Sequence, residues 1–147
     1  LKNFVKKISS KLKLIKNPQI LVCGIAFKGY PENSDMRFST SLDIINQLKQ
    51  NKKNKIFIYD PIISKRELTK LNYEIINITK TKRKFHTIIF ANNHNSFKNL
   101  EIDYLNSLLV SPKLLCDCWG LLKDNNFNFY KNLNYFGVGF EYSNNGS

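Results

Sequence analysis

Apolar residues along the chain recur with two different spacings, and the spacing changes several times. In residues 1–16 they fall every three or four positions with lysines between them, which predicts an amphipathic helix. Asn17-Pro18 is expected to end that helix, because the residue before a proline avoids helical geometry. Residues 20–27 form an almost unbroken apolar run, which is typical of a strand buried on both faces.

The rest of the chain continues this alternation of short strands and helices. A capping box of Thr40 and Asp43 predicts the start of a helix at residue 40, and Ser64 with Glu67 predicts another at residues 64–71. Further strands are predicted at residues 55–59, 73–76, 86–91, 114–119 and 135–138, and a further helix at residues 104–109. The predicted fold class is α/β: a three-layer, Rossmann-like domain with a mostly parallel sheet and helices on both faces.

This alternation also predicts how the chain is organised and where a ligand binds. We expect residues 1–17 to be a helical lead-in, residues 18–140 a single domain, and residues 141–147 a frayed tail. In open parallel sheets, ligands bind at the carboxyl ends of the strands, near a point where the strand order reverses. That edge should include Lys28, Asp60, the polar loop at residues 92–95, and Trp119.

Composition narrows the class of protein further. The 147 residues match one ordinary domain, and 42% hydrophobic content is enough for one core. No apolar stretch reaches the roughly 20 residues needed to span a bilayer, and no signal peptide is visible, so we expect a cytoplasmic protein. A chain that begins with Leu1 is also expected to be a fragment. Three cysteines, without a second Cys/His pair at zinc spacing, predict reduced, packed thiols and no metal site.

The formal net charge of +12 favours anionic partners, such as phosphates, nucleic acid or a membrane surface. The chain is equally rich in Asn and Ile, so part of the lysine excess reflects a compositional bias. The lysines are scattered, and no helix-turn-helix or RNP1-like string is present. A stand-alone basic binding module, with a nucleic-acid, regulatory or scaffolding role, remains the alternative to a phosphate-binding domain.

The loop after the first predicted strand contains the candidate binding chemistry. Gly24 and Gly29 permit close backbone approach, and Lys28 leaves the strand next to a helix N-terminus that favours a phosphate. The loop contains neither a Walker A motif nor GxGxxG, so it can equally be a solvated loop. Arg37 presents a planar fork suited to phosphate or carboxylate, and Asp35 is expected to order the loop.

Three other polar residues are not expected to take part in binding or catalysis. Asp60, before Pro61, is expected to form a structural turn rather than to bind a ribose hydroxyl. Neither His86 nor His94 has a Ser, Cys or carboxylate partner at a motif spacing, so neither is expected to be catalytic.

The same loop resembles a known family. The segments Gly24-Ile-Ala-Phe27-Lys28, Asp35-Met-Arg37-Phe-Ser39, Ser41-Leu-Asp-Ile-Ile45 and Tyr59-Asp60-Pro61 occur in order. They are similar to motifs of the C-terminal, nucleotide-sugar-binding domain of UDP-glucose/GDP-mannose dehydrogenases. Asp117-x-Trp119 and the segment at residues 135–139 resemble the family's closing motifs. The resemblance covers roughly residues 18 to 140, the span of one domain.

The resemblance implies roles for individual residues. It implies that Phe27 and Lys28 bind the nucleotide sugar, here a UDP-sugar or a related compound. It implies that Arg37 contacts NAD, which an N-terminal domain outside these residues mainly binds, while Asp35 orders the loop. The implied activity is NAD-dependent oxidation of the C6 alcohol of a UDP-sugar to a carboxylate, for surface polysaccharide precursors, by a homodimeric enzyme.

Several departures from the family are visible in the sequence. The loop from Lys28 to Arg37 is longer than is common, Thr40 replaces a frequent Pro, and Phe140 stands where an Arg often follows the last glycine. The family's catalytic cysteine lies in a Gly-Gly-x-Cys motif that these residues do not contain. We therefore assign no catalytic residue and expect the isolated chain to be inactive, with no specific nucleic acid and no membrane span.

Overall fold

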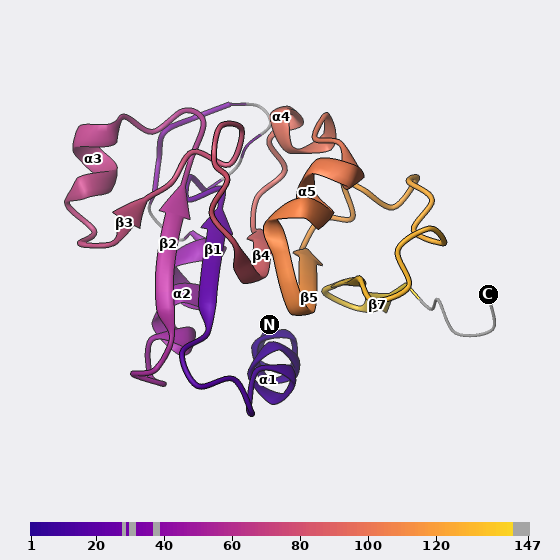
Figure 1. The fold of residues 1–147 in the computed structure, drawn as a ribbon. Helices are drawn as coiled ribbons and strands as arrows, with labels where there is room; N and C mark the ends of the chain where they lie inside the picture. The colour runs from indigo at the N-terminus through magenta and orange to yellow at the C-terminus, as the bar shows by residue number, and fades with distance from the viewer. Residues whose placement is uncertain (28, 30–31, 37–38, 143–147) are drawn as a thin grey trace.

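The structure is a computed structural model that describes residues 1–27, 29, 32–36 and 39–142. The predicted helices and strands alternate along most of the chain (Figure 1). The helices are α1 (Lys2–Lys11), α2 (Thr40–Leu48), α3 (Lys65–Thr69), α4 (Asn95–Lys98) and α5 (Ile102–Leu108). The strands are β1 (Gln19–Cys23), β2 (Lys55–Tyr59), β3 (Glu74–Ile75), β4 (Phe85–Phe90), β5 (Leu109–Asp117), β6 (Asn134–Gly137) and β7 (Phe140–Glu141).

The strands of the described residues form one sheet in the order β3-β2-β1-β4-β5-β6-β7. Every neighbouring pair is parallel except β6 and β7, which are antiparallel. In register, Leu21 of β1 lies between Phe57 of β2 and Ile88 of β4. The predicted α/β class and the mostly parallel sheet are confirmed, with one antiparallel edge strand that the sequence did not predict.

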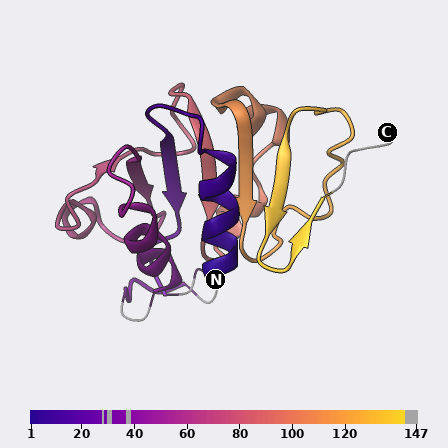
Figure 2. The same ribbon diagram turned by 90° about the horizontal axis from the view of Figure 1, so that it is seen from below.

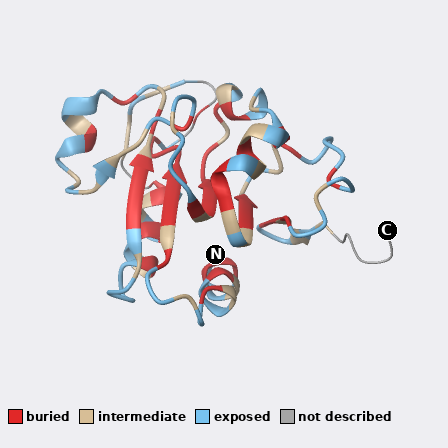
Figure 3. Ribbon diagram, in the orientation of Figure 1, coloured by how far each residue is buried: buried red, intermediate tan, exposed pale blue. Residues whose placement is uncertain are grey.

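Alternate residues of each central strand point to opposite faces of the sheet, and each face is covered by different helices. On one face, Ile20 and Val22 belong to a core that includes residues of α1 and α2. On the other, Leu21 and Cys23 belong to a core that includes residues of α4 and α5. The central strands are accordingly buried along most of their length (Figure 3). This accounts for their unbroken apolar runs, because neither face meets water.

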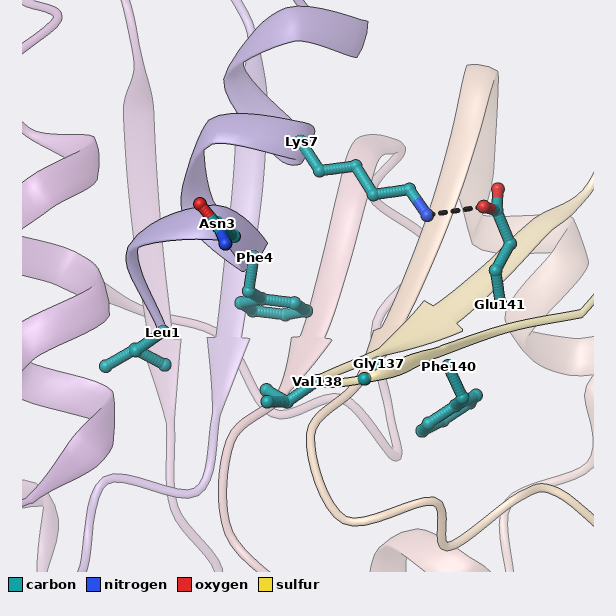
Figure 4. A pocket seen from close by; sticks show the side chains of 9 residues that line it. Leu1, Asn3, Phe4, Lys7, Gly137, Val138, Phe140 and Glu141 are labelled. Atoms are coloured by element: carbon teal, nitrogen blue, oxygen red, sulfur yellow. Dashed lines mark hydrogen bonds and ion pairs between the residues drawn. The ribbon is translucent and has the colours of Figure 1, made fainter.

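Helix α1 lies against one face of the sheet, over its central strands (Figure 2), and its buried residues belong to the first of these cores. Phe4 meets Phe136 of β6 edge to face, with ring centroids 6.0 Å apart. The Lys7 ammonium lies 4.4 Å from the centre of the Phe136 ring and 2.6 Å from the Glu141 carboxylate. Figure 4 shows Lys7 reaching over an open pocket between α1 and the β6–β7 turn. The expected lead-in helix thus contacts the far edge of the sheet.

Several predicted boundaries are wrong, for identifiable reasons. Helix α1 ends at Lys11 rather than near residue 16, because tight turns follow, with Ile15 N–H donating to Leu12 C=O at 2.9 Å. Strand β1 ends at Cys23, because Gly24 adopts φ +92° and turns the chain out of the sheet. The four-residue helix α4 was not predicted, since one turn is too short to show a periodicity.

The capping predictions had different outcomes at the two helices. At α3, the Ser64 side chain accepts a hydrogen bond from Glu67 N–H, so the expected cap is present. At α2, the N-cap is Ser39 rather than Thr40, and its side chain makes no capping bond. The Thr40 capping box was therefore wrong; the Ser39 hydroxyl donates instead to Ile25 C=O at 2.7 Å.

The chain remains ordered further than the expected tail boundary. Glu141 pairs with Phe136 in the β6–β7 ladder, and Tyr142 N–H donates to Tyr135 C=O at 2.9 Å. Residues 143–147 lie outside the described residues.

Candidate functional site

The strand order reverses between β1 and β4, which is where a parallel sheet forms a ligand crevice. From β1 the chain passes outward to β2 and β3, whereas from β4 it passes the other way to β5 and β6. The loops leaving the carboxyl ends of β1 and β4 therefore diverge from two neighbouring strands. In open α/β sheets, ligands bind at this point.

Gly24 and Asn92 are in close contact where these two loops leave the sheet. A Cβ atom on Gly24 would lie 2.5 Å from the Asn92 Oδ1, and the φ of +92° already disfavours any other residue. Asn92 is buried, and its Nδ2 donates to Ala26 C=O at 3.3 Å. Ala91 N–H also donates to Cys23 C=O at 2.8 Å. The backbone where these two loops leave the sheet is thus close-packed.

Asp60 fixes the same loop from the other side. It is 5% exposed, and its Oδ2 accepts from the backbone N–H groups of Ile25 and Ala26, at 2.7 and 2.9 Å. Its Oδ1 accepts from Ile62 and Ile63 N–H, at 2.8 and 2.9 Å. The structural turn predicted at Asp60 is present, and the same carboxylate additionally positions the end of β1. Both its oxygens are used, which argues against a ribose contact.

The start of α2 is fastened to this turn by two serine hydroxyls. Ser39 donates to Ile25 C=O at 2.7 Å, and Ser41 donates to Gly24 C=O. Both serines are buried. The end of β1, the following turn and the first turn of α2 therefore form one connected unit.

Two of the predicted site residues, Phe27 and Asp35, lie just beyond this unit. Phe27 is 44% exposed, and its N–H donates to the carbonyl of Asp35, which closes the loop between them. Asp35 N–H in turn donates to Asn33 Oδ1 at 3.1 Å. Lys28 and Arg37, the other two predicted site residues, lie outside the described residues. Phe27 and Asp35 are thus brought together at the crevice.

The loop after β4 contributes contacts that the sequence did not assign. Gly29 N–H donates to Asn93 Oδ1 at 2.9 Å. A Cβ on Gly29 would lie only 2.1 Å from the backbone nitrogen of His94. The His94 Nε2 also contacts the carboxylate of Glu32. The only sequence signal for these residues was the polar run Asn92-Asn93-His94 directly after a buried strand; the partner glutamate lies 62 residues away.

Asp117 ends β5 at the same edge of the sheet and is fully buried. Its Oδ2 accepts from Leu122 N–H at 2.8 Å and from the Tyr135 hydroxyl at 2.5 Å. Burial, and then this bond to Asp117, raise the pKa of Tyr135. Two residues later, Trp119 is 54% exposed. This edge of the sheet therefore has an exposed tryptophan two residues after the buried carboxylate of Asp117.

The three cysteines are free thiols, and none is poised as a nucleophile. Burial, and then the Asp60 charge, raise the pKa of Cys23 well above its ordinary value. Burial, and then Asp117, raise the pKa of Cys118 to about 12. Because the thiolate is the reactive form, these thiols are inert packing groups near neutral pH.

Neither a metal cluster nor a membrane helix is found in the part of the chain that the structure describes. No group of three or more His, Cys, Asp and Glu side chains there could hold a metal ion. Likewise, none of the helices in the described ranges is long and apolar enough to cross a bilayer.

The strand order and the loop geometry define an α/β domain of the kind that binds its ligand at a reversal of strand order. Its sequence matches the profile of the UDP-glucose/GDP-mannose dehydrogenase family, UDP binding domain, over residues 21–124. The chain belongs to this family, as its motifs predicted.

Individual relatives agree with this assignment. The chain is 30% identical, over 105 residues, to the UDP-N-acetyl-D-mannosamine dehydrogenase of Campylobacter jejuni, covering 69% of this chain and 25% of that protein. Among solved structures, it is similar to the UDP-N-acetyl-mannosamine dehydrogenase of S. aureus, with a TM-score of 0.69 and 20% identity, covering 94% of this chain and 30% of the other.

A UDP-glucose dehydrogenase from the hyperthermophilic archaeon Pyrobaculum islandicum is also similar in fold. Its TM-score is 0.58 at 14% identity, covering 79% of this chain and 25% of the other. The two structural similarities support the Rossmann-like fold. The chain spans only about a quarter of the length of the curated relative.

Proposed function

We propose that this chain is the nucleotide-sugar-binding domain of an NAD-dependent UDP-sugar 6-dehydrogenase, which oxidises the sugar C6 alcohol to a carboxylate. The observation that carries this proposal is the rigid turn at Gly24–Phe27, at the reversal of strand order, in a chain matching the UDP binding domain. A backbone that is already held by contacts with the β2 and β4 loops loses little conformational entropy when a ligand binds, so it can position binding groups efficiently.

Phe27 and Lys28 are the residues to which we assign substrate binding. Phe27 lies at the crevice with part of its ring in solvent, where it can contact an apolar face of a nucleotide or sugar. Lys28 follows it directly in the sequence and provides a charge that attracts a diphosphate. The net charge of +12 draws anionic ligands toward the whole domain.

Arg37 and Asp35 are assigned supporting roles on the same loop. We propose that Arg37 contacts NAD bound by another domain, and that Asp35 orders the loop between the two binding residues. The bond from Phe27 N–H to the Asp35 carbonyl supports the second of these roles, because it closes the loop next to Phe27.

The described residues do not fit NAD bound by this chain alone. In a dinucleotide-binding fold, an acidic residue after the second strand binds the ribose. Here that position is Asp60, whose oxygens already accept four backbone N–H groups. We therefore propose that NAD is bound mainly by a second domain of a longer chain, which forms a homodimer.

We propose a cytoplasmic location and a role in making surface polysaccharide precursors. Three free thiols suit a reducing compartment. The relatives named above include UDP-N-acetyl-mannosamine dehydrogenases, so UDP-N-acetyl-D-mannosamine is the first sugar nucleotide to test.

Calorimetric titration of the chain with UDP tests this proposal, with GDP and UDP-N-acetyl-D-mannosamine as comparison ligands. Lys28→Ala is expected to weaken UDP binding by about tenfold, the effect of one charge-assisted hydrogen bond. Lys52→Ala, at an exposed turn, is the matched control and should leave binding unchanged. Trp119 is the only tryptophan and lies at the binding edge, so its fluorescence gives an independent signal.

The titration also separates this proposal from a basic binding module. Such a module would retain single-stranded RNA at about 150 mM salt, where non-specific phosphate contacts are strongly weakened. Retention of RNA together with no heat from UDP would overturn the dehydrogenase proposal.

A further inference from the structure

Beyond the contact of Gly24 and Ala26 with Asn92, the loop leaving β1 is fastened to the loop leaving β4 at two further points. The first is Gly29, whose N–H donates to Asn93 Oδ1 at 2.9 Å and whose missing side chain allows the His94 backbone to approach. The second is Glu32, whose carboxylate contacts the His94 Nε2. Both points come from the loop that contains Lys28 and Arg37 in its sequence. The contacts therefore act on the segment to which binding has been assigned.

The two nitrogens of the His94 ring have separate partners, and these determine which nitrogen is protonated. Nδ1 accepts from Ser96 N–H at 3.0 Å, as the N-cap of α4. A neutral ring that accepts at Nδ1 has its hydrogen on Nε2. That hydrogen points at the Glu32 carboxylate and donates to it. One side chain thus caps α4 and binds the loop from β1.

The His94 ring is itself fixed by packing, so it can serve as an anchor. It is 8% exposed and meets Phe97 edge to face, with ring centroids 5.9 Å apart. Phe97 is fully buried and packs on Phe90 of β4, at a centroid distance of 5.0 Å. Glu32, by contrast, keeps 56% of its side chain exposed. The contact therefore joins a solvent-facing loop to the core of the sheet through a single histidine.

We propose that His94 is a positioning residue: through Glu32 it holds the described part of the β1–α2 loop, residues 29 and 32–36, against the β4–α4 loop in the arrangement that binds the nucleotide. This role rests on the proposed UDP binding, because Gly29 and Glu32 lie in the sequence between Lys28 and Arg37, the residues to which binding is assigned. His94 itself touches no reacting atom in this role. Its effect is on affinity, because a loop that is already ordered loses less conformational entropy when the ligand binds.

Two substitutions separate the loop contact from the cap of α4. In His94→Asn, the shorter side chain still caps Ser96 N–H, as Asn does at helix N-termini, but it cannot reach Glu32. Glu32→Ala removes the same contact from the exposed side and leaves every core residue in place, so it serves even if His94→Asn folds poorly. Each variant is expected to weaken UDP binding by about three- to tenfold and to speed hydrogen exchange at the Gly29 amide.

Matched controls lie elsewhere on the fold. His86→Asn is the same change at the other histidine, which lies on β4 and whose Nδ1 accepts from Gln19 N–H near the opposite end of the strands. Glu101→Ala removes an exposed glutamate at the start of α5, where it makes no capping bond. Neither control should change UDP affinity or exchange at Gly29.

The outcomes distinguish this proposal from the proposed function. If the unsubstituted chain binds UDP and both variants bind it equally well, with unchanged exchange at Gly29, the positioning role is wrong. If the unsubstituted chain binds no UDP, the proposed function fails. Exchange at Gly29 then decides alone whether His94 fixes the loop: faster exchange in Glu32→Ala supports the contact, and unchanged exchange overturns it.

Discussion

At the scale of single residues, Gly24 shows how backbone geometry determines the candidate site. Its φ of +92° turns the chain out of β1, and a Cβ there would collide with Asn92. Gly139 has a similar φ of +83°, but a Cβ there would meet nothing within 4 Å. Alanine substitutions at the two glycines therefore allow the free-energy cost of backbone strain to be distinguished from the cost of a steric clash.

We expect Gly139→Ala to lower the free energy of unfolding by about 1–2 kcal/mol, the usual cost of left-handed backbone in a residue with a Cβ. Gly24→Ala should lower it by about 2–5 kcal/mol, because overpacking adds to that strain. Chemical denaturation of both variants gives the comparison. Equal losses would mean that the contact between Gly24 and Asn92 is not tight.

The contacts of Asp60 and His94 show which features of the site could not be predicted from local sequence. The turn after β2 was predictable, because Asp-Pro is a local signal. The bonds from Asp60 to Ile25 and Ala26 were not, since they join residues about 35 positions apart. His94 was set aside for lack of a partner at motif spacing, and its partner Glu32 is found only when β1 and β4 become neighbours. Such contacts depend on topology, which a local motif does not contain.

At the scale of elements, the central sheet was predictable and its ends were not. Strands β1, β4 and β5 are long apolar runs, buried on both faces, so burial dictates their sequence. Helix α4 and strand β7 span four and two residues, too few for either period to appear. Asn17-Pro18 is a local signal for a helix end near residue 16, whereas α1 already ends at Lys11, so this boundary could not be found from the proline alone.

The attachment of α1 to the β6–β7 edge gives a prediction at this scale. A hydrogen bond from Lys7 lowers the pKa of Glu141, although burial opposes this. A carboxyl whose pKa is lowered on folding contributes stability above its ordinary pKa, near 4.3, and loses it as the pH falls through the folded value. We expect Glu141→Gln to lower the melting temperature by a few degrees at most at pH 7, and by progressively less as the pH falls below the ordinary glutamate pKa.

The control for this attachment is Glu67→Gln, which removes a surface pair to Lys70 within the α3 turn. Hydrogen exchange in α1 should quicken in Glu141→Gln and stay unchanged in Glu67→Gln. A melting difference between Glu141→Gln and the unsubstituted chain that stays constant as the pH is lowered through the acid range would contradict an ion-pair explanation.

At the scale of the whole molecule, the chain covers only about a quarter of its curated relative. The family's Gly-Gly-x-Cys motif is absent from these residues, and the three cysteines present are buried or half-buried thiols. We therefore expect the isolated chain to produce no NADH from NAD and UDP-N-acetyl-D-mannosamine. The absorbance of NADH should not rise at any concentration of the chain. Steady NADH formation would show that the 147 residues contain a complete active site.

The central claim is that the edge formed by the carboxyl ends of β1 and β4 binds the diphosphate nucleotide. A chain of 17.2 kDa is small enough for amide NMR, and a titration with UDP maps the site directly. We expect shifts in the amides of residues 24–27, Gly29 and residues 92–94, and none in the turn at residues 52–55 at the opposite edge. Shifts confined to that turn, or none at all at millimolar UDP, would contradict it.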